Sequence, residues 1–349
     1  MKKEELLSIY SNEAGRLGFK PIADEPYLIE PQPDVFTRLI QAGFLDERPA
    51  SLIIEEFSVQ DLDQVIEDET LKLNIVENYN NVAKHFGRAV SIPQFFVQPV
   101  VELGGTGIDF KVSVIERLIG GRIIPMELFA GGLDLSRESI RELVKKTAQV
   151  CYDTEQALKK FTESWLVPEM SVAEYFIRRF QKWHQLKKEQ GGGVCNPWPL
   201  VKYSREKSMV KFLEALELDD IEMSCGFNKF GNTDLIETDD GRFYILDAKI
   251  EAKPYGFLAA AWLWNLVLYG WKSHPEQLFE SFKTCLGIFH RVYQANDGFA
   301  PAIKYSMFER LYATLEIDLR YKCSPYNQLG DQELESAIQN VTYLMNQIL

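Results

Sequence analysis

The stretch CGFNKFGNTDLIETDDGRFYILDAK, residues 225–249, carries the densest pattern of chemically useful side chains in the chain. Two short runs, 233–237 and 243–247, are rich in apolar residues and flank an Asp-Asp-Gly sequence at 239–241. An Asp-Gly pair between such runs is a strong signal for a tight β-hairpin. We therefore expect two antiparallel strands over 233–249, joined by a turn at Gly241.

Polar side chains gather at the end of this hairpin that lies away from the turn. Asn232 and Asp234 stand at the start of the first strand, and Asp247 and Lys249 stand at the end of the second. Pairing across the turn brings these ends together, and an amide oxygen with carboxylates suits a hard cation such as Mg²⁺. The sequence predicts a magnesium site with Asn232 and Asp247 as ligands. The alternative, that these residues serve only the turn and the strand edge, stays open.

The order of elements along the chain favours an α+β fold with two lobes. An amphipathic helix is expected at 2–17, and strands at 51–57, 71–76, 95–103 and 111–118. Helices are expected at 136–160, 172–188, 204–216, 257–269, 275–293, 304–321 and 331–349. The pattern predicts a β-rich N-terminal lobe with a leading helix, residues 1–118. A mainly helical C-terminal lobe, residues 119–349, would carry the 233–249 hairpin.

Composition limits the function classes. The 349 residues are 46% hydrophobic and 26% charged, which is typical of a globular protein. The longest apolar run, 257–269, is too short to span a bilayer, and residues 1–7 do not resemble a signal peptide, so we expect a cytoplasmic protein without a membrane segment. The formal net charge of −13 argues against extended nucleic-acid binding. Five scattered cysteines without CxxC spacing argue against a disulfide framework or a cysteine zinc site.

The 225–249 segment resembles the catalytic region of the aminoglycoside phosphotransferase and choline kinase-like group. That group carries His-Gly-Asp, four residues, Asn, and then a hairpin that ends in Ile-Asp. Here Cys225-Gly226-Phe227 stands for His-Gly-Asp, Gly231-Asn232 is in register, and Ile245-Leu246-Asp247 stands for the metal-binding aspartate. Pro254 and Phe257-Leu258-Ala259-Ala260 are similar to the Pro…Asp-Leu-Ala that opens the next helix of the group.

The resemblance covers roughly residues 70–349, and it implies a two-lobed kinase-like fold that binds ATP and Mg²⁺ and acts on a small-molecule substrate. Residues 111–120 look like the strand and hinge between the lobes, which includes Glu116 in the nucleotide site. Lys72 is the residue that the resemblance offers as the phosphate-binding lysine. The helices at 308–321 and 334–349 look like the closing pair of the group.

The chain departs from this group at Phe227, which stands where the group has its catalytic aspartate. A phenyl ring cannot accept the hydroxyl proton. Asp234 and Glu222 are the neighbouring carboxylates that could replace the aspartate. The resemblance therefore implies either a divergent ATP- and Mg²⁺-dependent phosphotransferase or a pseudokinase, with the catalytic residue left unassigned.

A second resemblance is to PD-(D/E)XK nucleases, in which an Asp starts one strand, Asp/Glu-x-Lys ends the next, and a preceding helix supplies a Glu. Asp234, Asp247-Ala248-Lys249, and Glu206 or Glu214 fit that pattern. It implies a metal-dependent nuclease in which Lys249 positions or activates the attacking water. The acidic net charge, and the helices rather than strands expected after the hairpin, favour the kinase-like alternative.

Overall fold

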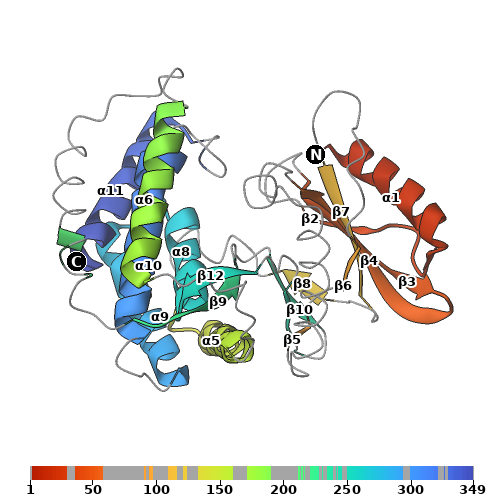
Figure 1. Cartoon of the computed structure of the whole chain (residues 1–349), viewed down its shortest axis with the longest axis horizontal. Helices are drawn as coiled ribbons and strands as arrows, with labels where there is room; N and C mark the ends of the chain where they lie inside the picture. Colours follow the sequence, from red (N-terminus) through yellow and green to blue (C-terminus); the bar gives the residue numbers. More distant parts are fainter. Residues whose placement is uncertain are drawn as a thin grey trace. The chain divides into compact units, whose positions relative to one another are not determined.

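The computed structural model describes residues 2–29, 36–57, 90–91, 94–96, 109–115, 121–123, 133–159, 171–189, 211–212, 214, 216, 221–227, 230, 234–238, 241, 243–245, 250–293, 299–320, 326 and 329–348 (Figure 1). The chain divides into two compact units. The first contains residues 1–123 and 233–248, and the second contains residues 124–232 and 249–349.

The first unit is built on an antiparallel sheet behind a leading helix, as the sequence predicts. The helix is α1 (Lys3–Leu17), and the strands are β1 (Lys20–Pro21), β2 (Tyr27–Ile29), β3 (Arg38–Leu45), β4 (Arg48–Phe57), β6 (Gln94–Phe96) and β7 (Asp109–Ile115). Their order is β1-β3-β4-β7-β6, and β2 also pairs with β3. The strand β3 was missed in the sequence analysis, and the expected strand at 71–76 lies outside the described residues.

Both faces of this sheet are covered, which explains the uninterrupted apolar run in β4. Leu52 and Ile54 face a core that includes Leu6 and Ile9 of α1. Ile53, between them, points to the opposite face and packs in a second cluster, made up of Ile29, Ile40, Ile53, Ile236 and Tyr244. A strand buried on both faces loses the usual alternation of apolar and polar residues.

The hairpin forms as predicted from its Asp-Gly turn. Strands β10 (Leu235–Thr238) and β11 (Phe243–Ile245) pair antiparallel, with Leu235 opposite Ile245. Gly241 has a φ of 76° and donates its amide hydrogen to the carbonyl oxygen of Thr238 at 2.8 Å. Glycine adopts this left-handed conformation without the strain that a side chain would add.

The hairpin belongs to the first unit, whereas the sequence analysis assigned it to the C-terminal lobe. Strand β10 pairs with β8 (Gly121–Ile123), and β11 pairs in parallel with β5 (Val90–Ser91). Ile236 and Tyr244 complete the second apolar cluster of the first unit. These long-range pairings, which sequence spacing does not reveal, decide the assignment.

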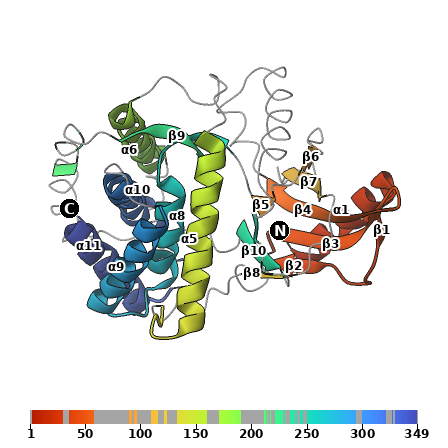
Figure 2. The ribbon, with the colours of Figure 1, turned by 90° about the horizontal axis from the view of Figure 1, so that it is seen from below.

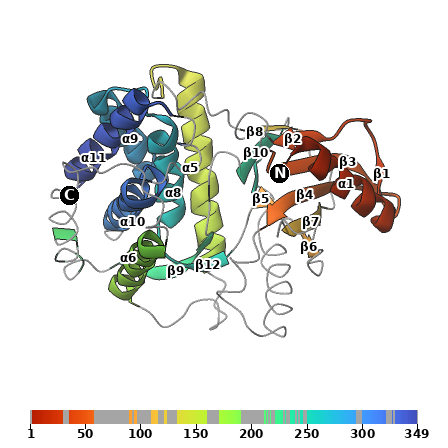
Figure 3. The same cartoon turned by 90° about the horizontal axis from the view of Figure 1, so that it is seen from above.

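The second unit is mainly helical, as expected. Its helices are α5 (Glu138–Lys159), α6 (Val172–Glu189), α8 (Phe257–Tyr269), α9 (Pro275–Val292), α10 (Phe299–Ala313), the π-helical η2 (Thr314–Asp318) and α11 (Asp331–Ile348). α5 runs beside α8 and α9 (Figure 2), and α10 lies against α6, α8 and α11 (Figure 3). The helix expected at 304–321 begins earlier, at Phe299, and its last turn is π-helical. Within the described residues no helix has the length and apolarity to span a membrane.

A two-stranded sheet also belongs to this unit, although the sequence analysis expected only helices after the hairpin. Strand β9 (Met223–Phe227) pairs antiparallel with β12 (Ile250–Pro254). The run Ile250–Pro254 was not recognised because it is short, carries two charged residues and ends in proline. Its pairing with β9 joins the two ends of the 225–249 segment that the sequence analysis singled out.

Candidate functional site

A buried ion cluster joins the hairpin to the main sheet of the first unit. Arg38 of β3 donates from Nε to Oε2 of Glu55 on β4 at 2.5 Å, and from Nη2 to Oδ1 of Asp234 at 3.2 Å. Arg38 and Glu55 lie directly opposite each other in the sheet. All three residues are at most 8% exposed. Charges buried to this extent are stable only when they are paired, and a guanidinium group has the fork of donors needed to bridge two carboxylates.

The sequence predicts a kinase-like site and, as the alternative, a nuclease site. Among the described residues of both, Asp234 alone makes a buried ionic interaction. It immediately precedes β10, and its carboxylate accepts from Arg38. The other predicted residues of the hairpin end, Asn232, Asp247 and Lys249, lie outside the described residues. In the described part of the hairpin, Leu235 pairs with Ile245.

The remaining predicted site residues are dispersed. Lys72, Glu116 and Glu206 lie outside the described residues. Glu214 is exposed on a short helical stretch of the second unit. Glu222 is half exposed and pairs with Lys159 at 2.6 Å. Within the described residues no group of three or more His, Cys, Asp and Glu side chains is placed to hold a metal ion.

Phe227 is the last residue of β9, opposite Ile250 of β12, and Gly226 beside it is closely covered. A Cβ atom on Gly226 would lie 3.0 Å from Cβ and Cγ of Lys253. Lys253 is 1% exposed, donates to the hydroxyl of Tyr175 at 3.3 Å, and has Nζ 4.6 Å from the ring centroid of Phe257. The aliphatic stem of Lys253 therefore packs over the strand that carries the Cys225-Gly226-Phe227 segment.

Glu155 of α5 holds the start of α8, a role that the sequence analysis missed. Its two carboxylate oxygens accept from the amides of Gly256 at 3.0 Å and Leu258 at 2.9 Å. The resemblance to the kinase group places Phe257 where an Asp is expected, and Glu155 brings a carboxylate to the same turn from another helix. Carboxylates are favourable at helix N-termini because free amides and the helix dipole face them. A glutamate on the apolar face of the amphipathic 136–160 pattern was the available signal.

Burial dominates the electrostatics around Glu155, which is 1% exposed. Desolvation raises the pKa of Glu155 to about 7, although the bonds from the two amides act in the opposite direction. Burial also raises the pKa of Tyr255 to about 12 and the pKa of Tyr293 well above its ordinary value. The Glu155 carboxyl group, which accepts hydrogen bonds from the first amides of α8, therefore titrates near neutral pH.

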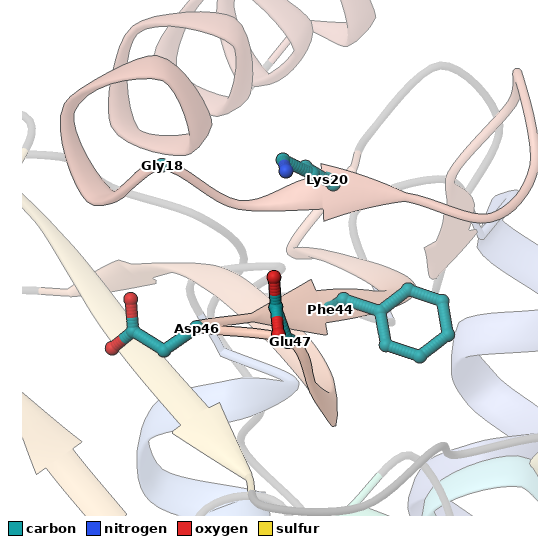
Figure 4. A pocket seen from close by; sticks show the side chains of 5 residues that line it. All are labelled: Gly18, Lys20, Phe44, Asp46 and Glu47. Carbon is teal, nitrogen blue, oxygen red and sulfur yellow. The ribbon is translucent and has the colours of Figure 1, made fainter.

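A surface hollow lies in the first unit, between the end of α1 and the turn that joins β3 to β4. Figure 4 shows its lining of Gly18, Lys20, Phe44, Asp46 and Glu47. Asp46 and Glu47 form the two-residue turn between β3 and β4, and both have positive φ, as the twist of a tight hairpin requires. None of these five described lining residues belongs to the kinase-like or the nuclease prediction.

No protein-family model matches the chain, and no curated protein matches it significantly. Solved structures do match over almost its whole length. Amicoumacin kinase hAmiN in complex with AMP-PNP and Ca²⁺ has a TM-score of 0.56 at 11% identity, with 98% of this chain and 93% of that chain covered. Aminoglycoside phosphotransferase APH(4)-Ia has a TM-score of 0.54 at 10% identity, with 97% and 98% covered. Choline kinase LicA from Streptococcus pneumoniae has a TM-score of 0.55 at 13% identity, with 97% and 98% covered.

These likenesses confirm the fold predicted from the 225–249 segment and its surroundings. The sheet of the first unit, the β9–β12 pair and the helices of the second unit belong to a chain that these structures match over 97–98% of its length. The structural likeness establishes a shared fold. At identities of 10–13% it does not establish a shared activity. The chain has the two-lobed α+β fold of the aminoglycoside phosphotransferases and choline kinases, in a strongly divergent form.

Proposed function

We propose that this chain is a divergent small-molecule phosphotransferase that binds ATP with Mg²⁺, and that its transfer step is slow or lost. The observation that carries the proposal is the whole-length likeness to solved structures of small-molecule kinases. The kinase-like segment supports it, since the hairpin that the resemblance requires forms between β10 and β11. The nuclease alternative finds no comparable support: the fold is kinase-like, and Asp234, its first carboxylate, already accepts from the buried Arg38.

Asn232 and Asp247 are the residues that we propose for the metal. An amide oxygen and a carboxylate are hard donors of the kind that Mg²⁺ binds while it keeps some of its water and gains phosphate oxygens. When bound, the ion would neutralise charge on the transferring phosphate groups. Lys72 and Glu116 remain proposals for phosphate and nucleotide contacts.

Phe227 limits the chemistry of the site. General-base help contributes typically about 10²–10⁴ in rate, and a phenyl ring supplies none. Because phosphoryl transfer relies mainly on positioning and charge stabilisation, nucleotide binding survives such a loss more easily than turnover does. We therefore propose nucleotide binding with slow or absent transfer to aminoglycoside- or choline-type acceptors.

Isothermal titration calorimetry with ATP, with and without Mg²⁺, tests this proposal. The wild-type chain is expected to bind ATP in a Mg²⁺-dependent manner, and Asp247→Ala is expected to lose the Mg²⁺ dependence because it removes a ligand. Asp153→Ala removes a surface carboxylate of α5 that accepts from Gln149 one helical turn away, so this control should bind as the wild type does. Mg²⁺-dependent binding that is unchanged in Asp247→Ala would show that this aspartate is only structural.

A further inference from the structure

Exposed large apolar side chains gather at one edge of the first unit. Among the described residues four such side chains are exposed, and three of them, Ile22, Tyr27 and Phe44, belong to this edge, with exposed fractions of 54%, 43% and 39%. The fourth, Ile177, lies on α6 of the second unit. Single exposed apolar residues are common on protein surfaces, whereas a contiguous group of them often marks an interaction site.

The strand register brings the three side chains of this edge together along β3. Alternate residues of a strand point to the same face of a sheet, so Phe44 shares a face with Ile40, four residues before it. Tyr27 of β2 pairs with Ile40 and therefore lies on that face too. The amide of Ile22 donates to the carbonyl oxygen of Ala42, between them, at 3.0 Å. We call Ile22, Tyr27 and Phe44 the apolar strip.

The apolar strip begins where the cover of this sheet face ends. Ile40 is 3% exposed, because it packs in the cluster to which the hairpin contributes Ile236 and Tyr244. Phe44 is not a member of that cluster, and it is 39% exposed. The opposite face of the sheet is closed by α1. The strip is therefore the part of an apolar sheet face that the described residues leave open.

A hollow of about 420 Å³ adjoins the strip at Phe44 (Figure 4). It lies next to β1, the outermost strand of the sheet on this side. Pro21 of β1 has no amide hydrogen to donate to a further strand, so strand addition is disfavoured here. A partner would instead be held by side chains that cover the strip and enter the hollow.

The charges around the strip favour a basic partner. Within 20–27 and 44–48 the exposed charged residues are four carboxylates and two cations, namely Asp24, Glu25, Asp46, Glu47, Lys20 and Arg48. The whole chain also carries a formal net charge of −13. Complementary charge favours association, and like charges disfavour it. A second copy of this chain, an anionic lipid surface and a nucleic acid would all bring negative charge to this edge.

We propose that the apolar strip binds a protein partner through a segment in which apolar side chains are flanked by lysine or arginine. The apolar side chains of the partner cover Ile22, Tyr27 and Phe44, and one of them enters the hollow. Its basic side chains pair with Asp46 and Glu47. Aromatic residues such as those of the strip are enriched in the buried centres of protein interfaces. The surface requires neither ATP nor Mg²⁺, so it is independent of the proposed phosphotransferase function.

Short synthetic peptides test this proposal on the full-length chain. One set carries leucine, phenylalanine or tyrosine at two central positions, flanked by lysine and arginine. A second set has glutamate in place of the basic residues, and a third has serine in place of the apolar residues. Fluorescence anisotropy of labelled peptides measures their affinity at low and at high salt. We expect the first set alone to bind, and to bind more weakly at high salt.

Substitutions on the chain assign the binding to the strip. Ile22→Ser and Phe44→Ser should each weaken peptide binding by about 10-fold or more, because each removes an apolar contact. Asp46→Asn combined with Glu47→Gln should reduce the salt dependence. Ile177→Ser removes a comparably exposed isoleucine from the second unit, so this matched control should bind as the wild type does. Ile22 is the most exposed residue of the strip, so Ile22→Ser keeps the test open if Phe44→Ser does not fold.

Three results would overturn the proposal. The first is a failure of the basic, apolar peptides to bind, or equal binding by the acidic set. The second is an equal loss of affinity in Ile22→Ser and Ile177→Ser. The third comes from sedimentation velocity at increasing protein concentration: self-association that Phe44→Ser abolishes would assign the strip to a second copy of the chain. None of these measurements contains ATP, so they leave the proposed function to the calorimetry described above.

Discussion

Replacement of Glu155 by glutamine should remove a pH dependence from the stability of the second unit. Glu155 is buried against the amides of Gly256 and Leu258, and burial raises its pKa from 4.5 to about 7. In the unfolded chain the carboxyl group loses its proton near pH 4.5, whereas in the folded chain it keeps the proton up to about pH 7. The stabilisation associated with this group is therefore complete below pH 4.5 and is lost as the pH rises to about 7.

The size of the effect follows from the rise in pKa. At about 1.4 kcal/mol for each pH unit, a rise from 4.5 to about 7 corresponds to about 3 kcal/mol of unfolding free energy. The glutamine side chain would carry no charge at any pH and would offer one acceptor oxygen to the two amides. The unpaired amide should cost about 1–3 kcal/mol, largely independent of pH. The difference in stability between wild type and Glu155→Gln should therefore shrink, and can reverse, as the pH rises.

Urea unfolding at pH 5, 6, 7 and 8, followed by tryptophan fluorescence, measures this difference. Trp262 of α8 is fully buried, so its emission reports on the helix that Glu155 caps. Burial also raises the pKa of Asp318 to about 6. Because Asp318 is present in both proteins, its contribution to the pH dependence of stability cancels in the difference. Glu276→Gln, at an exposed position in the first turn of α9, is the matched control and should show no such trend. A constant difference between wild type and Glu155→Gln from pH 5 to pH 8 would refute the reasoning.

Further predictions concern the segment around Phe227. Phe227→Asp should raise ATP turnover, because it restores a proton acceptor where the kinase group has its catalytic aspartate. If the wild-type chain turns over ATP fast and Phe227→Asp does not change the rate, the catalytic segment has been placed wrongly. Lys249→Ala should leave Mg²⁺-dependent ATP binding nearly unchanged, whereas metal-dependent DNA or RNA cleavage that disappears in this variant would favour the nuclease. Gly226→Ala should cost about 1–3 kcal/mol in urea unfolding, because the new methyl group lies 3.0 Å from carbon atoms of Lys253. Gly287→Ala, inside α9 with its nearest neighbour at 3.8 Å, is the control and should stabilise by about 1 kcal/mol.

Local patterns identified many of the elements. The helix at 257–269 was predicted at its observed bounds, since thirteen mostly apolar residues between Gly256 and Gly270 require a buried helix. The hairpin followed from Asp-Gly between apolar runs. Strand β12 was missed because it is short, carries two charged residues and ends in proline, and its partner strand β9 is distant in the sequence.

The amino-acid sequence by itself determined the α+β class, the hairpin and the kinase-like order of the 225–249 segment, because turn chemistry and apolar periodicity act over a few residues. Tertiary structure alone decided that the hairpin joins the first unit, that Arg38 bridges Glu55 and Asp234, and that Glu155 caps α8. Buried charges must find partners wherever the fold brings them, and these partners lie 17, 196 and 101 residues apart in the chain. No local pattern encodes such distances.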